Sequence, residues 1–257
     1  MKKLFNNQIK LIKSLGNKKG RGETGLFVAE GRKAVKELLK SQIKTEFLVF
    51  DKEFPFDGFM AENKNSAGIE FYSHSVDSIS SMKSSEGILA VAKIPLCTDT
   101  NLFFNSKINL LGLFGISDPG NMGTLLRTAY WFGLEGIVLY DNCADVFSPK
   151  VIRSSMGSVF HIDILEFRNF TESSVFLDQY SKIGTFLDEK NNYKHSTDKK
   201  KIIFLGNEAN GLDNILKDKI DFNFRIDSAG KFDSLNVSVA GGIIINEIFN
   251  TKRGSSC

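Results

Sequence analysis

Three short segments rich in small and polar residues, each joined to an apolar run, limit what this chain can fold into. They are Asp118–Ala129, Leu205–Leu212 and Ser234–Ala240. The first two follow apolar runs typical of β-strands, and the third opens an apolar run with helical spacing. Loops of this composition commonly lie on a rigid scaffold and bind ligands. We therefore expect a binding site built from three loops that are far apart in the sequence.

The second half of the chain alternates strands and helices. Its predicted strands are 109–115, 136–140, 159–164, 182–187, 201–205 and 222–226. Its predicted helices are 122–132, 149–156, 171–180 and 236–249. This alternation predicts an α/β domain with a parallel sheet covered on both faces. We expect Asn121 to cap the first of these helices and Ser234 the last, because both residue types are favoured at N-caps.

The first half is a smaller α/β segment. Its predicted strands are 26–29, 47–50, 69–72 and 87–93, with helices at 30–40 and 76–82. Residues 95–107 combine Pro, Cys, Thr, Asp and Asn without periodicity, which is typical of a linker. A length of 257 residues allows two domains. We predict them at 1–94 and 108–257, joined by the linker 95–107.

Basic residues concentrate in the first 36 positions, where ten lysines and arginines face only Glu23 and Glu30. The net charge of the whole chain is only +3, so this local excess is more informative than the overall balance. A basic patch of this kind suits phosphate groups, and Lys10, Lys13 and Arg21 are our candidate RNA contacts. The alternative is a solvated lysine-rich helix face.

Gly20–Gly25 matches the Gly-x-Gly-x-x-Gly pattern of dinucleotide-binding folds, but its context is reversed. That pattern must follow a strand and open a helix. Here a basic segment precedes it and the predicted strand 26–29 follows. We interpret it as a flexible loop that brings Arg21 to RNA phosphate.

The cysteines and histidines do not indicate a metal site. Cys97, Cys143 and Cys257 are far apart and form no Cys-x-x-Cys pair, so neither zinc binding nor a disulfide framework is predicted. The three histidines lack ligand spacing. No apolar run approaches the ~20 residues of a membrane helix, and no signal-peptide core follows the first lysines. We expect a soluble, cytoplasmic protein.

Two residues in the three segments stand out chemically. Arg127 is one of only seven arginines among 33 basic residues, which indicates a need for a planar, permanently charged group. A surface salt bridge is the alternative. Gly206 lets a ligand approach the backbone closely, and we expect a larger side chain there to exclude the ligand while leaving the fold intact. An ordinary turn with glycines is the alternative at this position.

The three segments resemble, in order and spacing, the motifs of the SpoU (TrmH) family of RNA ribose 2′-O-methyltransferases. This family belongs to the trefoil-knotted methyltransferases that use S-adenosylmethionine. The resemblance covers about residues 105 to 253 and implies a knotted parallel-sheet domain. By resemblance, the active-site residues are Arg127, Asn121, Glu208, Ser234 and Asn236. By resemblance, the cofactor-binding residues are Gly206, Ile226 and Leu235.

The third motif departs from the family at two positions. The usual Ile-Pro-Met is here Ile226-Asp227-Ser228, so the loop lacks the proline that restricts it in the family. Between the first two motifs, residues 148–157 resemble another family segment rich in small residues. Lys150 and Arg153 are candidate phosphate contacts there, with ordinary surface charges as the alternative.

The N-terminal half resembles the substrate-binding domain often joined to SpoU domains, through residues 27–39 and 86–92. That domain is akin to a ribosomal-protein RNA-binding fold. The resemblance implies methylation of a ribose 2′-hydroxyl in structured RNA by a homodimer. The expected substrate is a guanosine of ribosomal RNA, with transfer RNA as the alternative. A non-catalytic RNA-binding or assembly factor is the rival, supported by Asp227 and Ser228.

The role of Arg127 follows from its chemistry. Arginine is a poor general base because its pKa exceeds ~12. We therefore expect Arg127 to stabilise a developing alkoxide or to position phosphate. Base catalysis by Arg127 is the alternative.

Overall fold

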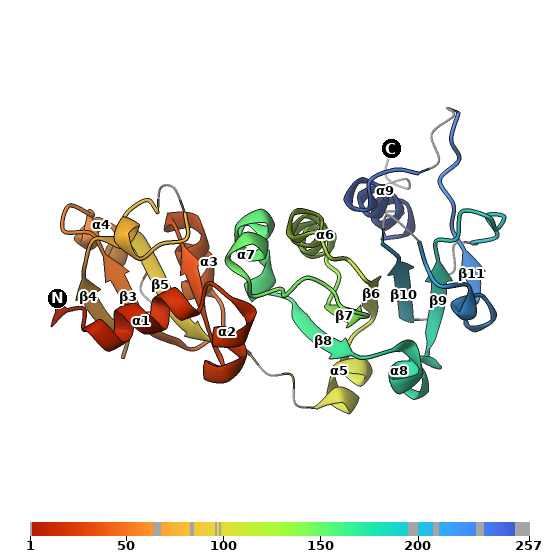
Figure 1. Ribbon diagram of the computed structural model, residues 1–257. Coiled ribbons are helices and arrows are strands. Elements are labelled where there is room, and N and C mark those ends of the chain that lie inside the picture. The colour runs from red at the N-terminus through yellow and green to blue at the C-terminus, as the bar shows by residue number, and fades with distance from the viewer. Residues whose placement is uncertain are drawn as a thin grey trace. The chain divides into compact units, whose positions relative to one another are not determined.

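The chain forms two compact units in the computed structural model shown in Figure 1. The first unit is Met1–Leu96 with Asp145–His161, and the second is Cys97–Ala144 with Ile162–Cys257. The structure describes residues 2–63, 68–82, 85–95, 97, 99–194, 200–207, 211–229 and 234–249. This division differs from a continuous second domain over 108–257, because Asp145–His161 packs with the N-terminal unit.

The first unit contains a mixed sheet with strand order β1-β4-β3-β5-β2. Its strands are β1 (Lys2–Lys3), β2 (Leu26–Glu30), β3 (Thr45–Phe50), β4 (Glu70–Ser73) and β5 (Ile88–Lys93). Strand β5 runs antiparallel to both β2 and β3, so this sheet is not parallel throughout, as strand–helix alternation would predict. Glu86 and Gly87, both at positive φ, form the turn that leads into β5.

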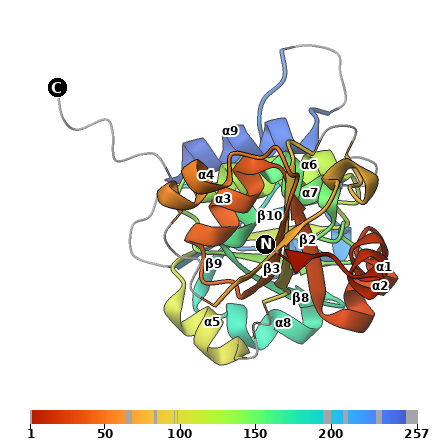
Figure 2. The ribbon, with the colours of Figure 1, turned by 90° about the vertical axis from the view of Figure 1, so that its left-hand side faces the viewer.

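Helices cover both faces of this first sheet. They are α1 (Asn6–Ser14), α2 (Lys18–Thr24), α3 (Arg32–Lys40) and α4 (Phe56–Glu62), and the single turn η1 (Val76–Ser78) precedes β5. Successive strand residues point to opposite faces. Val28 and Val49 therefore join Ile12 of α1 in one buried cluster. Figure 2 shows α1 and α3 on opposite sides of the sheet.

The second unit is built on a sheet with order β11-β9-β10-β6-β7-β8. Its strands are β6 (Asn109–Phe114), β7 (Gly136–Tyr140), β8 (Asp163–Phe167), β9 (Tyr180–Gly184), β10 (Lys200–Leu205) and β11 (Phe222–Asn223). Every neighbouring pair is parallel, so the predicted parallel sheet is confirmed. The strands are almost continuously apolar, as expected for a sheet buried on both faces.

Helices flank this second sheet on both sides. They are α5 (Thr100–Ser106), α6 (Pro119–Trp131), α8 (Phe170–Leu177) and α9 (Val237–Phe249), with the short η3 (Asn214–Lys219). Helices α6 and α9 lie on one face and α5 and α8 on the other (Figures 1 and 2). Among the described residues, no helix is long and apolar enough to cross a membrane.

Residues 100–106 and 159–164 do not have the local structure that the sequence predicted. Residues 100–106 of the expected linker form α5, because Asp99 caps the helix and Phe103 and Phe104 are buried in the second core. Residues 159–164 do not form one strand, since the turn η2 (Ser158–Phe160) precedes β8. Phe160 belongs to the core of the first unit, where its ring stacks on Phe27 with centroids 5.6 Å apart.

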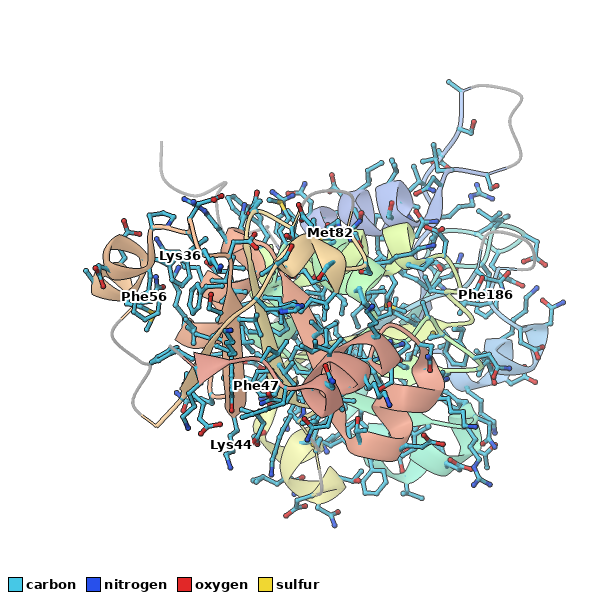
Figure 3. All side chains as sticks on the ribbon, turned by 60° about the vertical axis from the view of Figure 1, so that its left-hand side comes forward. Lys36, Lys44, Phe47, Phe56, Met82 and Phe186 are labelled. Carbon is cyan, nitrogen blue, oxygen red and sulfur yellow. The ribbon has the colours of Figure 1, made fainter. Side chains whose placement is uncertain are left out.

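Both units have aromatic-rich cores. Phe47 of the first unit and Phe186 of the second, labelled in Figure 3, are both buried. In the second core, the hydroxyl of Tyr180 donates to the carbonyl of Phe104 at 2.7 Å. Burial raises the pKa of the Tyr180 and Tyr140 hydroxyls. Both tyrosines are therefore neutral structural groups at physiological pH.

Candidate active site

The strand order of the second sheet creates a switch point between β6 and β10. From β6 the chain proceeds to β7 and β8 on one side, whereas β9, β10 and β11 lie on the other. Ligands in open α/β sheets bind at the carboxyl ends of strands where the order reverses in this way. Asp118–Ala129 follows β6 and Leu205–Leu212 follows β10, so both segments begin at this point.

The loops after β6 and β10 are in close contact. Leu113 and Leu205 are register partners near the ends of these strands. Gly115 follows with φ +63°, a conformation that favours glycine, and a Cβ added there would lie 3.0 Å from Nδ2 of Asn207. Parallel pairing therefore joins the first and second motifs directly.

Helix α6 begins earlier than the sequence prediction. It starts at Pro119, which suits a first helical turn. The carboxylate of Asp118 accepts the backbone N–H of Asn121 at 2.8 Å and caps the helix. The prediction that Asn121 is the cap was therefore wrong. The side chain of Asn121 is left to make contacts outside its own helix.

Asn121 contacts the third motif. Nδ2 of Asn236 donates to Oδ1 of Asn121 at 3.0 Å. Oδ1 of Asn236 accepts the backbone N–H and the hydroxyl of Ser238, at 2.9 and 2.6 Å. Asn236, rather than Ser234, is therefore the cap of α9. One amide links the first turns of α6 and α9, where backbone N–H groups favour electronegative ligand atoms.

Helices α6 and α9 also pack closely below these turns. A Cβ added at Gly241 of α9 would lie 2.5 Å from Leu125 and 2.9 Å from Leu205. A larger residue at Gly241 would separate α9 from both α6 and β10. This close packing holds the three motifs at one edge of the sheet.

Gly206 is buried against the backbone of its own loop, which the sequence did not indicate. A Cβ added there would lie 2.0 Å from the backbone carbonyl of Gly211 and 2.3 Å from the backbone nitrogen of Leu212. The backbone N–H of Gly211 donates to the carbonyl of Asn207 at 2.9 Å, which closes the loop on itself. A larger side chain at Gly206 would therefore disturb this loop, contrary to the expectation of an intact fold.

Arg127 is exposed on α6, two helical turns after Asn121. Within the part of the chain that the structure describes, its guanidinium makes no hydrogen bond or ion pair. The surface salt bridge considered from the sequence is therefore not observed. A cation with this freedom can meet an anionic ligand atom without first breaking an internal contact.

The remaining cofactor-binding and active-site candidates differ in their exposure to solvent. Ile226 is half-buried in the segment after β11, and Ser234 and Leu235 are exposed just before α9. The pairing of β11 with β9 brings Ile226 to the same edge of the sheet as the other motifs. Glu208 lies outside the described residues.

The candidate RNA contacts separate into two groups. Lys10 and Lys13 are exposed on α1, and Lys150 and Arg153 are exposed on α7 (Pro149–Ser155). These four side chains are accessible to phosphate.

Arg21 is too buried to make the predicted phosphate contact. Residues 18–24 form helix α2 rather than a flexible loop, and Arg21 is 3% exposed. Its Nε and Nη2 donate to Oδ2 of Asp145 at 2.9 and 2.6 Å, and its Nη1 donates to the carbonyl of Leu15 at 2.7 Å. The side chain is a structural link to the segment Asp145–His161.

Sequence reasoning also missed Asp118 and Asn207. An aspartate directly before Pro-Gly at the start of an apolar helix is a recognisable capping signal. The signal was present, but Asn121 was a competing candidate three residues later. Nothing local to Asn207 indicates its approach to Gly115, which depends on the pairing of β6 with β10.

Cys143 follows β7 and is buried. The thiol of Cys143 donates to the carbonyls of Leu113 and Tyr140, and burial raises the pKa of this thiol. Cys143 is therefore a protonated packing residue. Among the described residues, no group of three His, Cys, Asp or Glu side chains could hold a metal ion.

Comparison with known families gives two matches along the chain. Residues 109–246 match the SpoU rRNA Methylase family, and residues 6–90 match the MRM3-like substrate binding domain. The first match spans all three motif segments. The second spans the chain from α1 to the first residues of β5.

Comparison with individual proteins extends over nearly the whole chain. The 23S rRNA (guanosine(2553)-2′-O)-methyltransferase RlmP of Bacillus subtilis is 34% identical over 93% of this chain and 95% of its own. An AdoMet-bound rRNA methyltransferase from Sinorhizobium meliloti is 27% identical, with a TM-score of 0.81 over 96% of this chain and 95% of that structure. The SpoU methyltransferase AviRb from Streptomyces viridochromogenes, 21% identical, shares the fold with a TM-score of 0.86 over 98% of this chain and all of its own.

Proposed function

The chain belongs to the SpoU rRNA methylase family, and from this premise we propose that it methylates a ribose 2′-hydroxyl of ribosomal RNA. S-adenosylmethionine is the methyl donor. The observation that carries the proposal is the direct contact between Asn121 and Asn236. It joins the first and third family motifs at the switch point of the parallel sheet.

The edge formed by the β6 and β10 loops suits S-adenosylmethionine. Gly206 brings backbone without a side chain to this edge, Ile226 and Leu235 supply apolar surface, and all three belong to the matched family region. The bound cofactor supplies an electrophilic methyl group on a sulfonium. The similar Sinorhizobium meliloti structure is AdoMet-bound, which supports the same ligand class here.

In the proposed reaction, the ribose 2′-oxygen forms a bond to the methyl carbon as the carbon–sulfur bond breaks. The 2′-hydroxyl proton is released to solvent water, and loss of the methyl group converts the sulfonium to a neutral thioether. Arg127 stabilises negative charge that develops on the attacking oxygen. Asn121 and Asn236 hold the first turns of α6 and α9 in place around that oxygen. Glu208 and Ser234 complete the proposed set by family resemblance.

The substrate we propose is a guanosine in ribosomal RNA. The Bacillus subtilis relative acts on 23S rRNA according to its name, and it aligns along almost the whole chain. The match of residues 6–90 to a substrate-binding domain supports RNA recognition by the first unit. Lys10, Lys13, Lys150 and Arg153 are the exposed cations we assign to phosphate. A ribosomal substrate places the enzyme in the cytoplasm.

We also propose that the protein is a homodimer with a trefoil knot in its second unit. Large apolar side chains remain exposed on the packed helices α6 and α9. Trp131 is 81% exposed, Val239 52% and Ile243 40%. Exposed apolar groups of this size on neighbouring helices suit a symmetric subunit contact.

The test measures transfer of a labelled methyl group from S-adenosylmethionine to ribosomal RNA. We expect incorporation that maps to one ribose, and no modification at that ribose in cells lacking the protein. Transfer RNA serves as the competing substrate. The non-catalytic rival predicts RNA binding without methyl transfer, and calorimetry with S-adenosylmethionine shows directly whether the donor binds.

A further inference from the structure

A buried asparagine lies in β11, where a parallel sheet normally has an apolar residue. Asn223 is 5% exposed. An amide in the sheet interior is costly unless its donors and acceptors are bonded. The partners of Asn223 therefore indicate what the residue does.

The partners of Asn223 come from one segment, residues 186–193, which follows β9 and which we call the post-β9 segment. Oδ1 of Asn223 accepts the backbone N–H of Phe186 at 2.8 Å. Nδ2 donates to the carbonyls of Phe186 and Glu189 at 3.0 and 3.2 Å. The backbone N–H of Asn223 donates to Oδ1 of Asn192 at 2.6 Å, and its carbonyl accepts the N–H of Tyr193 at 3.2 Å. One residue thus fastens both ends of the post-β9 segment to β11.

Arg225 continues this attachment toward the third motif. Its Nη1 donates to the carbonyl of Leu187 at 3.5 Å, and its own carbonyl accepts Nδ2 of Asn191 at 3.4 Å. Its Nε and Nη2 both donate to Oδ1 of Asp227, at 3.3 and 3.0 Å. The residues on both sides of Ile226 therefore make side-chain contacts, and the backbone carbonyl of Arg225 is also bonded.

These contacts include Asp227, which stands at the position where the SpoU motif that this chain resembles has proline. Proline restricts a loop through its fixed φ angle. Aspartate lacks that restriction, but here its carboxylate is held by Arg225 two residues earlier. We propose that Asn223 and Arg225 are positioning residues that hold the Ile226 loop at the cofactor edge of the sheet. This inference rests on the proposed use of S-adenosylmethionine.

The main test is Asn223→Asp, which keeps the shape of the side chain but replaces the donor group with a carboxylate oxygen. Two carbonyls then face an oxygen instead of an N–H, which destabilises the attachment. We expect the Kd for S-adenosylmethionine to rise about 10-fold. The kcat at saturating cofactor should stay within about 2-fold of wild type, because Asn223 acts through the loop. Asn101→Asp, an exposed change of the same chemistry on α5, is the matched control and should change neither value.

Hydrogen exchange tests the attachment without the cofactor. The amide protons of Phe186 and Tyr193 should exchange faster in Asn223→Asp than in the Asn101→Asp control. Arg225→Met, a milder change at a partly exposed side chain, should raise the cofactor Kd about 3-fold. If Asn223→Asp does not fold, the cofactor Kd of Arg225→Met tests the positioning role instead.

The outcomes separate this inference from the proposed function. A wild-type protein that does not bind S-adenosylmethionine contradicts the proposed function. Given wild-type binding, an unchanged Kd in folded Asn223→Asp overturns the positioning role. If that variant does not fold, an unchanged Kd in Arg225→Met overturns it.

Discussion

The two units each contain an arginine that the sequence marks for function, and the structure uses them in opposite ways. Arg21 in the first unit is buried, with three hydrogen bonds to Asp145 and Leu15. Arg127 in the second unit is exposed and makes no hydrogen bond or ion pair with any residue that the structure describes. The same residue type is therefore a buried structural contact in one unit and an exposed side chain in the other.

The difference arises from the local environment of each helix. Helix α2 turns Arg21 inward against the segment Asp145–His161, where a charge must be paired to remain buried. Helix α6 buries Leu125, Leu126 and Ala129, and Arg127 lies on the opposite, solvent-facing side. Of the two arginines, the exposed Arg127 is therefore the better candidate for binding a ligand.

Replacing Arg127 should give the largest effect on activity. We expect Arg127→Ala to slow methyl transfer by roughly 100- to 1,000-fold, the usual result of removing one donor to a developing oxyanion. Cofactor affinity and the unfolding midpoint should stay near wild type. Arg127→Lys should restore only part of the rate, because a point charge does not reproduce the guanidinium fork. Single-turnover methyl transfer at saturating RNA and cofactor is the measurement, and a near-normal rate for the alanine variant would show that another group activates the hydroxyl.

Replacing Arg21 should give the reverse pattern. Arg21→Met removes the partner of Asp145, and we expect a loss of about 2–3 kcal/mol in the unfolding free energy of the first unit. This loss is smaller than for a fully buried ion pair, because the Asp145 side chain is 20% exposed and keeps some water. Denaturant unfolding followed by a probe in the first unit measures this loss. Arg127→Met is the matched control, and equal stability of the two variants would remove the distinction between the two arginines.

The elements of the second unit could largely be predicted from sequence because their signals are local. The strands β6, β7 and β10 are apolar runs next to glycine or lysine, and their predicted bounds agree with the structure to within one residue. The helix α9 has a long apolar period, although its cap is Asn236 and not the predicted Ser234. These elements needed no knowledge of distant contacts.

Two of the unforeseen contacts depend on partners far away in the chain. Arg21 is buried by Asp145, which lies 124 residues later, and no local pattern distinguishes it from an exposed arginine. The pairing of Asn121 with Asn236 spans 115 residues. It also required Asp118 to take over the capping role, so the local signal at Asn121 favoured the wrong interpretation.

The link between Asn121 and Asn236 gives a moderate expected effect within the second unit. Loss of the cap in Asn236→Ala should destabilise the protein by about 1 kcal/mol. If the two amides act as a pair, the effects of Asn121→Ala and Asn236→Ala on methyl-transfer rate should not add. We expect a coupling free energy of about 1 kcal/mol in a double-mutant cycle. Additive effects would mean that the two residues act separately.

The exposed lysines of α1 should give the smallest effect, and it concerns the first unit alone. Lys10→Gln with Lys13→Gln removes two candidate phosphate contacts. We expect RNA affinity to fall several-fold at moderate salt, and the slope of log affinity against log salt to flatten by about 1.4–1.8, since each contact contributes about 0.7–0.9. Lys40→Gln with Lys44→Gln is the matched control, because it removes the same charge from lysines that are paired with Glu37 and Glu46. If both pairs change the slope equally, the first unit attracts RNA through its total charge. If only the α1 pair changes the slope, the surface of α1 contacts RNA, whereas the buried Arg21 stabilises the fold.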